Sequence, residues 1–394
     1  MSPQRIAIVL REMGCGGAER MVVTLGSLLR ERGNEVTIVT TSRPGSEFGL
    51  LEAHGLNGIH IEGRFTSSAI IHAFRVGNYL RRTGFDVVIP TNSERFVQSA
   101  LNLIENRVVV IPWIHSDYND AYNKAKVNNR LWNIAVACGP GVAAKASKRM
   151  SPVVSIPNGR TFEFDHLADS RVQHSHPFKL IYVGRLTQLN KNVLLLPQIL
   201  RECIAKQLDV QLEVVGEGDA MTHLIHLRKS LGLESRMTLL GLLDEERVFQ
   251  RLASSHALLL PSSHEGLPIV PIEAQSMKCV PIATRLPGVT DVVIEVGLTG
   301  FLVNFNDTAE FAQRIGYLVA NPSKWKQMGE LGRKKVALEF DTKRMGDTFA
   351  GLIERASKGE YPTKKRRRPL WPVNVSNFSW REMLPRFFRL TYWR

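Results

Sequence analysis

The sequence predicts an α/β protein made of two doubly wound domains, and three features of the chain support this. With 394 residues, the chain is longer than one ordinary hydrophobic core requires. Short apolar runs alternate with segments of helical spacing, a pattern typical of parallel sheets covered by helices on both faces. The alternation weakens between Pro157 and Pro177, where Asn158-Gly159 and a polar stretch predict a linker, and it then begins again.

The first half opens with a strand, a glycine-rich loop and a helix. Ile6–Leu10 is a continuous apolar run, Arg11–Gly17 holds the glycines, and Ala18–Arg30 has apolar residues at helical spacing that end at Gly33. Because further runs that read as buried on both faces follow and are separated by helices, we expect a mostly parallel sheet. Those further strands are predicted at Glu35–Thr40, Asp86–Pro90, Val108–Ile111 and Ile134–Ala137.

The second half repeats the pattern. Strands are predicted at Lys179–Val183, Gln211–Val215, Met237–Leu240, Ala257–Leu260 and Val280–Ala283, and helices near Asn192–Ala205 and Met221–Leu231. We therefore predict a first domain over residues 1–160, a second over 175–345, and a C-terminal helix with a tail over 346–394. Ligands of such sheets bind beyond the carboxyl ends of the strands, so we expect site residues in post-strand loops that face a cleft between the domains.

Charge is concentrated at the end of the chain. The net charge is +14, and the residues from Tyr361 onward contain nine basic residues and a single acid, Glu382. Lys364–Arg368 followed by spaced aromatic residues predicts that the tail 361–394 binds an anionic membrane surface. Packing of the tail on the first domain is the open alternative. We expect no nucleic-acid partner, because the charge is confined to the end and no nucleic-acid motif accompanies it.

The cysteines and the apolar runs bear on location. Cys15, Cys138, Cys203 and Cys279 lie far apart without zinc-like spacing, so we expect reduced thiols. The first apolar run is too short for a signal peptide, and no run of the length of a transmembrane helix follows. These features predict a cytoplasmic protein, peripheral at the inner face of the membrane if the tail binds lipid.

The segment Ser262–Ala274 (SSHEGLPIVPIEA) has the strongest chemical signal. It follows an apolar strand, so Glu265 falls in a loop and Gly266 lets the backbone approach a ligand. A helix is expected to begin near Leu267 or Pro268, because proline suits a first helical turn, and the free amides of such a helix start suit phosphate or sugar oxygens.

Glu273 lies little more than one turn into that helix, so its carboxylate and that of Glu265 can face the same ligand. A carboxylate accepts two hydroxyl hydrogen bonds at once, which suits a sugar or a ribose diol. Two solvated glutamates on a loop and a helix are the plain structural alternative.

Glu265 and Glu273 form an E-x7-E arrangement within EGLPIVPIEA that resembles the signature of the GT-B family 4 retaining glycosyltransferases (glycosyl transferases group 1). The resemblance covers residues 5–350 and implies two Rossmann-like domains facing a central cleft. It also implies that Glu273 binds the nucleotide ribose and that Glu265 contacts the donor sugar. Gly266, Leu267 and Pro268 would line the donor. The tail after Tyr361 has no counterpart in the family.

The loop in Tyr182–Lys191 (YVGRLTQLNK) places an arginine and a lysine after a strand. Two cations there suit a nucleoside diphosphate that leaves with extra negative charge, although solvated surface charge is the alternative. In the family pattern, G-R-L is followed shortly by K-G, and the Arg and Lys hold the diphosphate. Arg185 and Lys191 match this pattern, whereas Asn192 replaces the usual glycine.

Two further segments resemble the family in the first half. In Gly14–Arg20 (GCGGAER), Gly16 and Gly17 match the loop whose amides approach the donor, and the glycines do not meet the G-x-G-x-x-G spacing of a dinucleotide-binding dehydrogenase. His115, in PWIHSDY, matches a histidine that hydrogen-bonds the donor sugar in related enzymes. A structural histidine is the alternative.

The resemblance implies transfer of a sugar from a nucleoside-diphosphate sugar, which we expect to be UDP-linked, to a glycan or lipid-linked acceptor in cell-surface glycan synthesis. No carboxylate nucleophile is clearly placed, so the leaving phosphate would take the acceptor proton while the configuration is retained. We expect no cofactor and no metal, because no D-x-D pair follows a strand. A sugar-nucleotide epimerase or phosphorylase of the same fold, and a non-catalytic nucleotide-sugar-binding protein, are the alternatives.

Overall fold

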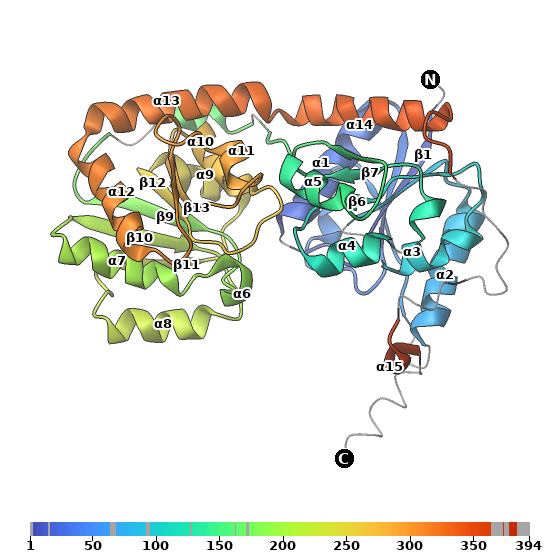
Figure 1. The fold of residues 1–394 in the computed structure, drawn as a ribbon, viewed down its shortest axis with the longest axis horizontal. Helices are drawn as coiled ribbons and strands as arrows, with labels where there is room; N and C mark the ends of the chain where they lie inside the picture. The colour runs from blue at the N-terminus through green and yellow to red at the C-terminus, as the bar shows by residue number, and fades with distance from the viewer. Residues whose placement is uncertain are drawn as a thin grey trace, which may run out of the picture. The chain divides into compact units, whose positions relative to one another are not determined.

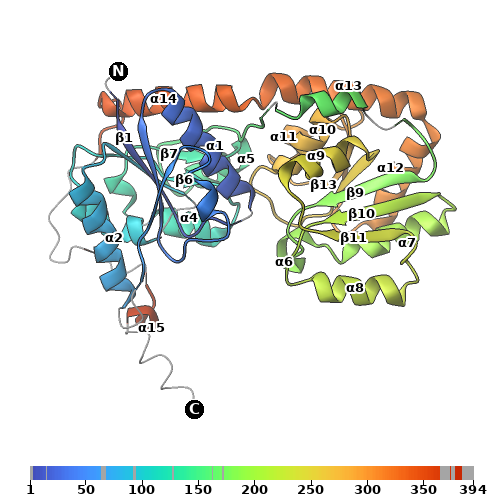
Figure 2. The ribbon, with the colours of Figure 1, turned by 180° about the vertical axis from the view of Figure 1, so that it is seen from behind.

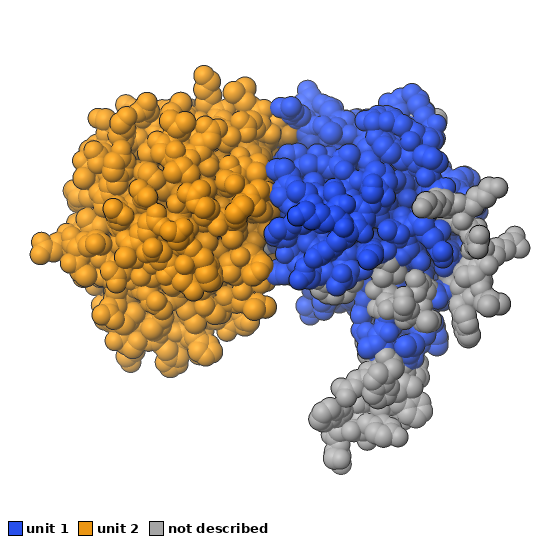
Figure 3. Space-filling model, viewed as in Figure 1, with its two compact units in different colours: residues 1–158, 342–394 blue, residues 159–341 orange. Residues whose placement is uncertain are grey.

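A computed structural model describes the chain over residues 3–14, 16–63, 68–91, 95–126, 128–161, 163–170, 173–363, 373 and 378–383 (Figure 1). The chain divides into two compact units (Figure 3). The first unit combines Met1–Asn158 with Thr342–Arg394, and the second is Gly159–Asp341. Each unit is a parallel α/β structure, so the predicted fold class of two Rossmann-like domains is confirmed.

The described part of the first unit contains a five-stranded parallel sheet of order β3-β2-β1-β4-β5 and a three-stranded parallel sheet of order β6-β7-β8. The strands are β1 (Arg5–Leu10), β2 (Glu35–Thr40), β3 (Asn57–His60), β4 (Val87–Pro90), β5 (Val109–Val110), β6 (Trp113–Ile114), β7 (Ala135–Ala137) and β8 (Val153–Ser155). Ile6 to Val9 are fully buried, which explains the continuous apolar run of β1.

One predicted strand in this unit is shorter than expected. The run Val108–Ile111 contributes only β5, and a second short strand, β6, follows Pro112. Proline has no amide hydrogen for a strand ladder, whereas its carbonyl still accepts a hydrogen bond from the Val136 amide (2.8 Å). This interruption places His115 directly after β6.

Helices cover the sheets of the first unit, as Figures 1 and 2 show. They are α1 (Gly17–Glu31), α2 (Ala69–Thr83), α3 (Arg95–Ala100), α4 (Asn119–Lys126), α5 (Pro140–Ser147), α14 (Thr342–Ser357) and α15 (Trp380–Met383), with short 3₁₀ helices at Phe48–Leu50, Leu101–Leu103 and Asn129–Leu131. In both views α14 lies beside α1. At Gly346 of α14 an added Cβ would come within 3.0 Å of the Leu28 side chain, so the two helices approach closely.

The second unit contains a six-stranded parallel sheet of order β11-β10-β9-β12-β13-β14. The strands are β9 (Phe178–Val183), β10 (Val210–Val215), β11 (Met237–Gly241), β12 (Ala257–Leu260), β13 (Val280–Thr284) and β14 (Phe301–Val303). The helices are α6 (Gln188–Lys191), α7 (Leu195–Ala205), α8 (Met221–Ser230), α9 (Glu245–Ala253), α10 (Ile269–Ser276), α11 (Thr290–Val293), α12 (Thr308–Ala320) and α13 (Pro322–Glu339), with a 3₁₀ helix at Asp165–Ser170.

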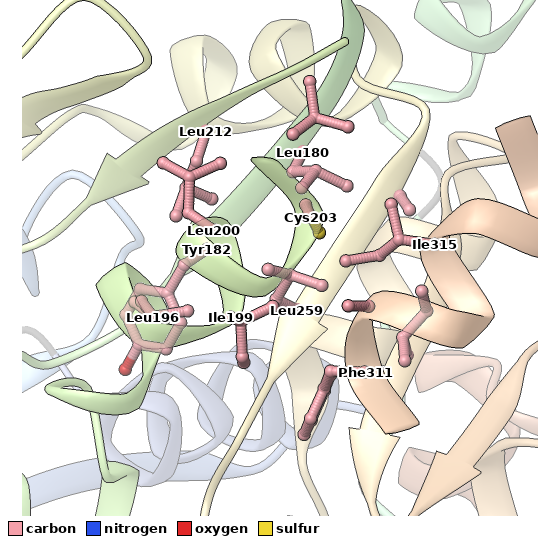
Figure 4. Packing of buried hydrophobic residues seen from close by; sticks show 14 of the residues in the cluster. Leu180, Tyr182, Leu196, Ile199, Leu200, Cys203, Leu212, Leu259, Phe311 and Ile315 are labelled. Carbon is pink, nitrogen blue, oxygen red and sulfur yellow. The ribbon is translucent and has the colours of Figure 1, made fainter. Parts of the chain in front are cut away.

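Both faces of this sheet are packed. On one face, side chains from β9, β10 and β12 meet those of α7 and α12; Figure 4 labels Leu180, Tyr182, Leu212, Leu259, Leu196, Ile199, Leu200, Cys203, Phe311 and Ile315. On the other face, Ile181 and Leu258 pack with Phe249 of α9 and Ala274 of α10. Consecutive residues of β9 thus point to opposite apolar layers, which is why the strand has no polar alternation.

The unit boundaries differ from the predicted ones in two places. The segment predicted as a linker packs into the second unit, where Phe164 stacks on Phe249 (4.9 Å between ring centroids) and Ala168 is buried. The helix predicted to begin a separate C-terminal part is α14, which joins the first unit through its contact with α1. Neither assignment follows from average polarity, because a few apolar side chains decide where a segment packs.

Part of the C-terminal tail packs on the first unit. Phe378 is buried and stacks on Phe96 of α3 (6.0 Å between centroids), and Arg95 pairs with Glu382 of α15. Packing on the first unit, one of the two alternatives for the tail, therefore holds for these residues. Lys364–Arg368 and most of the aromatic residues of the tail lie outside the described residues. No helix in the described ranges is long and apolar enough to cross a membrane.

Candidate functional site

The order of the strands in the second unit identifies where a ligand would bind. From β9 the chain proceeds outward to β10 and β11, and it then returns to β12 on the other side of β9 before continuing to β13 and β14. In an open parallel sheet, the crevice at such a reversal of strand order is the usual ligand site. The loops that follow β9 and β12 carry Arg185, Lys191 and Glu265, so the predicted residues flank this switch point.

The two loops are joined directly. Lys191 Nζ lies 2.7 Å from Glu265 Oε1, and the side chains are 20% and 9% exposed. The Ser263 amide donates to the Asn190 carbonyl (2.9 Å), and the Ser263 hydroxyl donates to the Leu189 carbonyl (2.9 Å). A cation and an anion that were predicted to contact different parts of one ligand therefore contact each other in this structure.

The backbone of the loop that carries Arg185 is held by a hydrogen bond from a core residue. The Tyr182 hydroxyl donates to the Arg185 carbonyl (2.9 Å). Burial raises the pKa of Tyr182, and the Glu265 carboxylate raises it further, so the hydroxyl keeps its proton and stays a donor. The Arg185 side chain is exposed. The cation is thus free to reach a ligand while its backbone is held by the core.

The turn after β10 supports the same loop. The Leu186 amide donates to the Glu217 carbonyl (2.8 Å), and the Ala220 amide donates to the Leu186 carbonyl (2.9 Å). Gly216 has a φ of 129°, and a Cβ added there would lie 2.0 Å from the Gly184 carbonyl oxygen. The glycine is therefore required by close backbone contact, and this turn helps to hold the loop that carries Arg185.

The helix predicted after Glu265 is α10. It begins at Ile269 with Pro268 as its N-cap residue, close to the predicted start at Leu267 or Pro268. Glu273 is buried, with 1% of its surface exposed, whereas Glu265 is only partly buried. The second carboxylate therefore lies deeper in the unit than that of Glu265.

Arg160 is a buried neighbour of Glu273 that the sequence did not single out. Burial lowers the pKa of Arg160, and the carboxylates of Asp165 and Glu273 oppose that change. Arg160 also forms an ion pair with Asp165, and its amide donates to the Phe340 carbonyl (2.8 Å). No local motif marks Arg160 as a neighbour of Glu273, because Glu273 and Phe340 are distant in the chain and meet it only after folding.

Gly16 and Gly17 lie at the start of α1. Gly16 is the N-cap residue, and its carbonyl accepts a hydrogen bond from the Arg20 amide (3.0 Å). A Cβ added at Gly16 would lie 2.1 Å from Glu19 Oε2, so the Glu19 carboxylate lies over this glycine. Since a carboxylate complements the positive end of a helix dipole, an incoming phosphate would have to displace or share that position.

His115 directly follows β6 in the first unit. Its ring packs against Trp113 (4.1 Å between centroids), and burial lowers the pKa of His115 to about 3. The imidazole is therefore neutral at physiological pH, because ionisation would place a charge in an apolar environment. A neutral ring can exchange a hydrogen bond with a hydroxyl group, but it has no acidic proton to transfer near pH 7.

The predicted residues are shared between the units. Gly16, Gly17 and His115 belong to the first unit, and Arg185, Lys191, Glu265, Gly266, Leu267, Pro268 and Glu273 belong to the second. Within the described ranges, no group of three His, Cys, Asp or Glu side chains is placed to hold a metal ion. Cys138 and Cys203 are buried free cysteines. Burial raises the pKa of Cys203 to about 12, so its thiol stays protonated at neutral pH.

Solved structures share this two-unit architecture. HepE of Anabaena, in complex with UDP and glucose, matches with a TM-score of 0.75 and 18% identity over 89% of this chain and 99% of its own. Sucrose-phosphate synthase of Thermosynechococcus elongatus matches with a TM-score of 0.74 and 19% identity over 90% and 100%. These likenesses show that the chain has the GT-B fold.

Two family models match consecutive parts of the chain. "Glycosyltransferase Family 4" matches residues 15–163 and "Glycosyl transferases group 1" matches residues 166–335. The chain belongs to the group 1 GT-B glycosyltransferases. An uncharacterized glycosyltransferase of Haemophilus influenzae is 24% identical over 89% of this chain and its own full length. The lipopolysaccharide core biosynthesis glycosyltransferase LpsE of Rhizobium meliloti is 25% identical over 86% of this chain and 96% of its own.

Proposed function

We propose that this protein is a retaining glycosyltransferase that transfers a sugar from a UDP-sugar to a hydroxyl group of a polysaccharide or lipid-linked glycan. The Lys191–Glu265 pair at the switch point of the second unit is the observation that carries the proposal, because it joins a cation for the diphosphate to a carboxylate for the sugar. Similar proteins support the chemical class: HepE has been solved with UDP-glucose, and LpsE acts in lipopolysaccharide core biosynthesis.

In this mechanism the bond between the anomeric carbon and the donor phosphate oxygen breaks, and the acceptor oxygen forms a bond on the same face of the sugar. The departing phosphate takes the proton of the acceptor hydroxyl. Arg185 and Lys191 stabilise the negative charge that grows on the diphosphate, with the amides near Gly17 as further donors. We assign this charge stabilisation to the protein's own cations and propose no cofactor or metal.

The carboxylates and the histidine orient the donor in the same proposal. Glu265 accepts hydrogen bonds from the sugar hydroxyls, and the deeper Glu273 accepts them from the ribose. His115, held neutral by burial, hydrogen-bonds a sugar hydroxyl, and its backbone carbonyl faces the positive charge that develops on the ring. Before the donor binds, Glu265 compensates the charge of Lys191; afterwards the diphosphate shares that cation.

An acceptor-dependent assay tests the reaction. Release of UDP from a panel of UDP-sugars is measured with and without glycan acceptors, and the anomeric configuration of the product is determined by NMR. The proposal requires UDP release that rises at least tenfold with an acceptor and a product that keeps the configuration of the donor. Conversion of the UDP-sugar without any acceptor would instead identify an epimerase, and binding of UDP without turnover would identify a non-catalytic protein.

The proposal includes a place of action at the cytoplasmic face of a membrane. The nine basic residues from Tyr361 onward support it, since each cation near anionic lipid contributes about 1 kcal/mol. Phe378, however, is packed against Phe96 and is not available to lipid in this arrangement. Flotation with anionic vesicles should therefore be lost when Lys364–Arg368 are replaced by glutamine and retained in Phe378→Leu. Equal flotation of the glutamine variant would remove the membrane proposal.

A further inference from the structure

A chain of side-chain amides connects the Lys191 loop to a loop far away in the sequence. Gln188 Nε2 donates to Asn192 Oδ1 (2.7 Å), and Asn192 Nδ2 donates to Asn306 Oδ1 (2.8 Å). Asn192 directly follows Lys191, whereas Asn306 lies in the loop between β14 and α12. The loop that carries the donor-site lysine is therefore tied across the carboxyl edge of the sheet.

The direction of these hydrogen bonds is set by a backbone group. The Leu194 amide donates to Gln188 Oε1 (3.1 Å), and a backbone N–H can only donate. Gln188 must then present its NH₂ group to Asn192, so Asn192 accepts with Oδ1 and donates with Nδ2. Asn306 consequently acts as an acceptor. This relay of side-chain amides, Gln188–Asn192–Asn306, therefore has a single consistent assignment of donors and acceptors.

The backbone at Asn192 explains why the relay matters for Lys191. Asn192 has φ 51° and ψ 39°, a left-handed conformation that ends α6 directly after the lysine. Asparagine tolerates this conformation better than most residues, although less well than glycine. Asn192 is also buried, and its side-chain hydrogen bonds hold the strained position that sets the exit of the chain from α6.

The loop at the other end of the relay is well anchored. The Asp307 side chain accepts from the Glu310 amide (2.8 Å), and the Asn304 amide donates to the Glu310 carboxylate (3.0 Å). Asn306 is itself left-handed, with φ 60°. Because both ends of this short loop are held by the start of α12, Asn306 presents its carbonyl oxygen from a fixed place.

We propose that Asn306 is a positioning residue for the donor site, acting through Asn192 on Lys191. This inference rests on the proposed function, because it assigns Lys191 to the donor diphosphate. The relay holds the left-handed turn after Lys191. The backbone of Lys191 therefore stays in place at the switch point while its ammonium group turns from Glu265 to the diphosphate. Loss of the relay lets the turn relax, and the cation then binds the diphosphate less well.

The experiment measures the affinity for UDP by isothermal titration calorimetry at 0.15 M salt. Asn306→Gly deletes the acceptor while tolerating the left-handed backbone, and it should weaken UDP binding about fivefold, the size expected for one hydrogen bond. Asn306→Asp keeps an acceptor oxygen and should stay within about twofold of the parent. Asn192→Gly preserves the backbone but breaks the relay, and it should match Asn306→Gly.

Two combinations separate positioning from a structural role. Asn192→Gly with Asn306→Gly should bind UDP no more weakly than either single variant, because both break the same relay. Asn306→Gly should have no further effect on UDP affinity in Lys191→Met, because the group that it positions is gone. A further fivefold loss in that background, or parent-like affinity of Asn306→Gly, overturns the inference but leaves the proposed function intact. Unchanged UDP affinity of Lys191→Met itself overturns both.

Discussion

Removing Lys191 should destabilise the second unit through the charge that it leaves behind. Two unit charges 2.7 Å apart attract each other by about 6 kcal/mol at an effective dielectric constant of about 20, and desolvation offsets much of that attraction. The Glu265 side chain is only 9% exposed, and Lys191→Met removes the cation that pairs with it. We expect a loss of about 3 kcal/mol in the free energy of unfolding.

Removing the charge of Glu265 instead should reduce the free energy of unfolding by less. In Glu265→Gln, the remaining lysine is on a long side chain that is already 20% exposed and can turn toward water, so we expect a loss of about 2 kcal/mol. The double variant leaves no uncompensated charge, and it should also lose about 2 kcal/mol rather than the roughly 5 kcal/mol of an additive effect.

Urea denaturation followed by circular dichroism, with all four proteins in the same buffer, measures this cycle. The coupling between the two positions should be about 3 kcal/mol and should fall only slightly in 0.5 M salt, because the pair is mostly shielded from solvent. Additive losses in the double variant would refute the reasoning, since they would show that the two side chains do not interact in solution.

Three further predictions follow from other parts of the structure. The pKa of His115 in the folded protein is about 3 and its usual value is 6.5, so the free energy of unfolding should rise with pH between about 3 and 6.5 and level off above. Between pH 7.5 and pH 5 the parent should lose about 2 kcal/mol more of this free energy than His115→Gln, as measured by urea denaturation. Gly216→Ala should reduce the free energy of unfolding by about 3 kcal/mol and lower the melting temperature, because the added Cβ meets a backbone carbonyl. The control Gly351→Ala, in open space on α14, should be neutral or slightly stabilising. Equal melting temperatures of the two variants would contradict the close contact at Gly216. Phe378→Ala should destabilise the protein by about 3 kcal/mol, since a buried ring is removed, and the exposed control Leu50→Ala should change stability by less than about 0.5 kcal/mol in the same thermal melt.

Local sequence pattern was sufficient for most elements. The predicted strands Glu35–Thr40 and Ala257–Leu260 have the same bounds in the structure. Ala257–Leu260 is an uninterrupted apolar run that is buried on both faces, and Glu35–Thr40 is rich in the β-branched residues that favour strands. The start of α10 was also predicted within two residues, since proline favours the beginning of a helix. The pattern missed β3 (Asn57–His60), an edge strand whose residues are only partly buried, so no apolar run marks it.

The sequence alone therefore determined the fold class and the loops in which the candidate site residues lie, because periodicity and turn residues act locally. The tertiary structure decided how these residues are used. The reversal of strand order brings the loops after β9 and β12 together, so that Lys191 pairs with Glu265. Long-range packing also places Asn306 against Asn192 and Phe378 against Phe96. Such contacts join residues that are far apart in the chain, and no local pattern encodes which of them will meet.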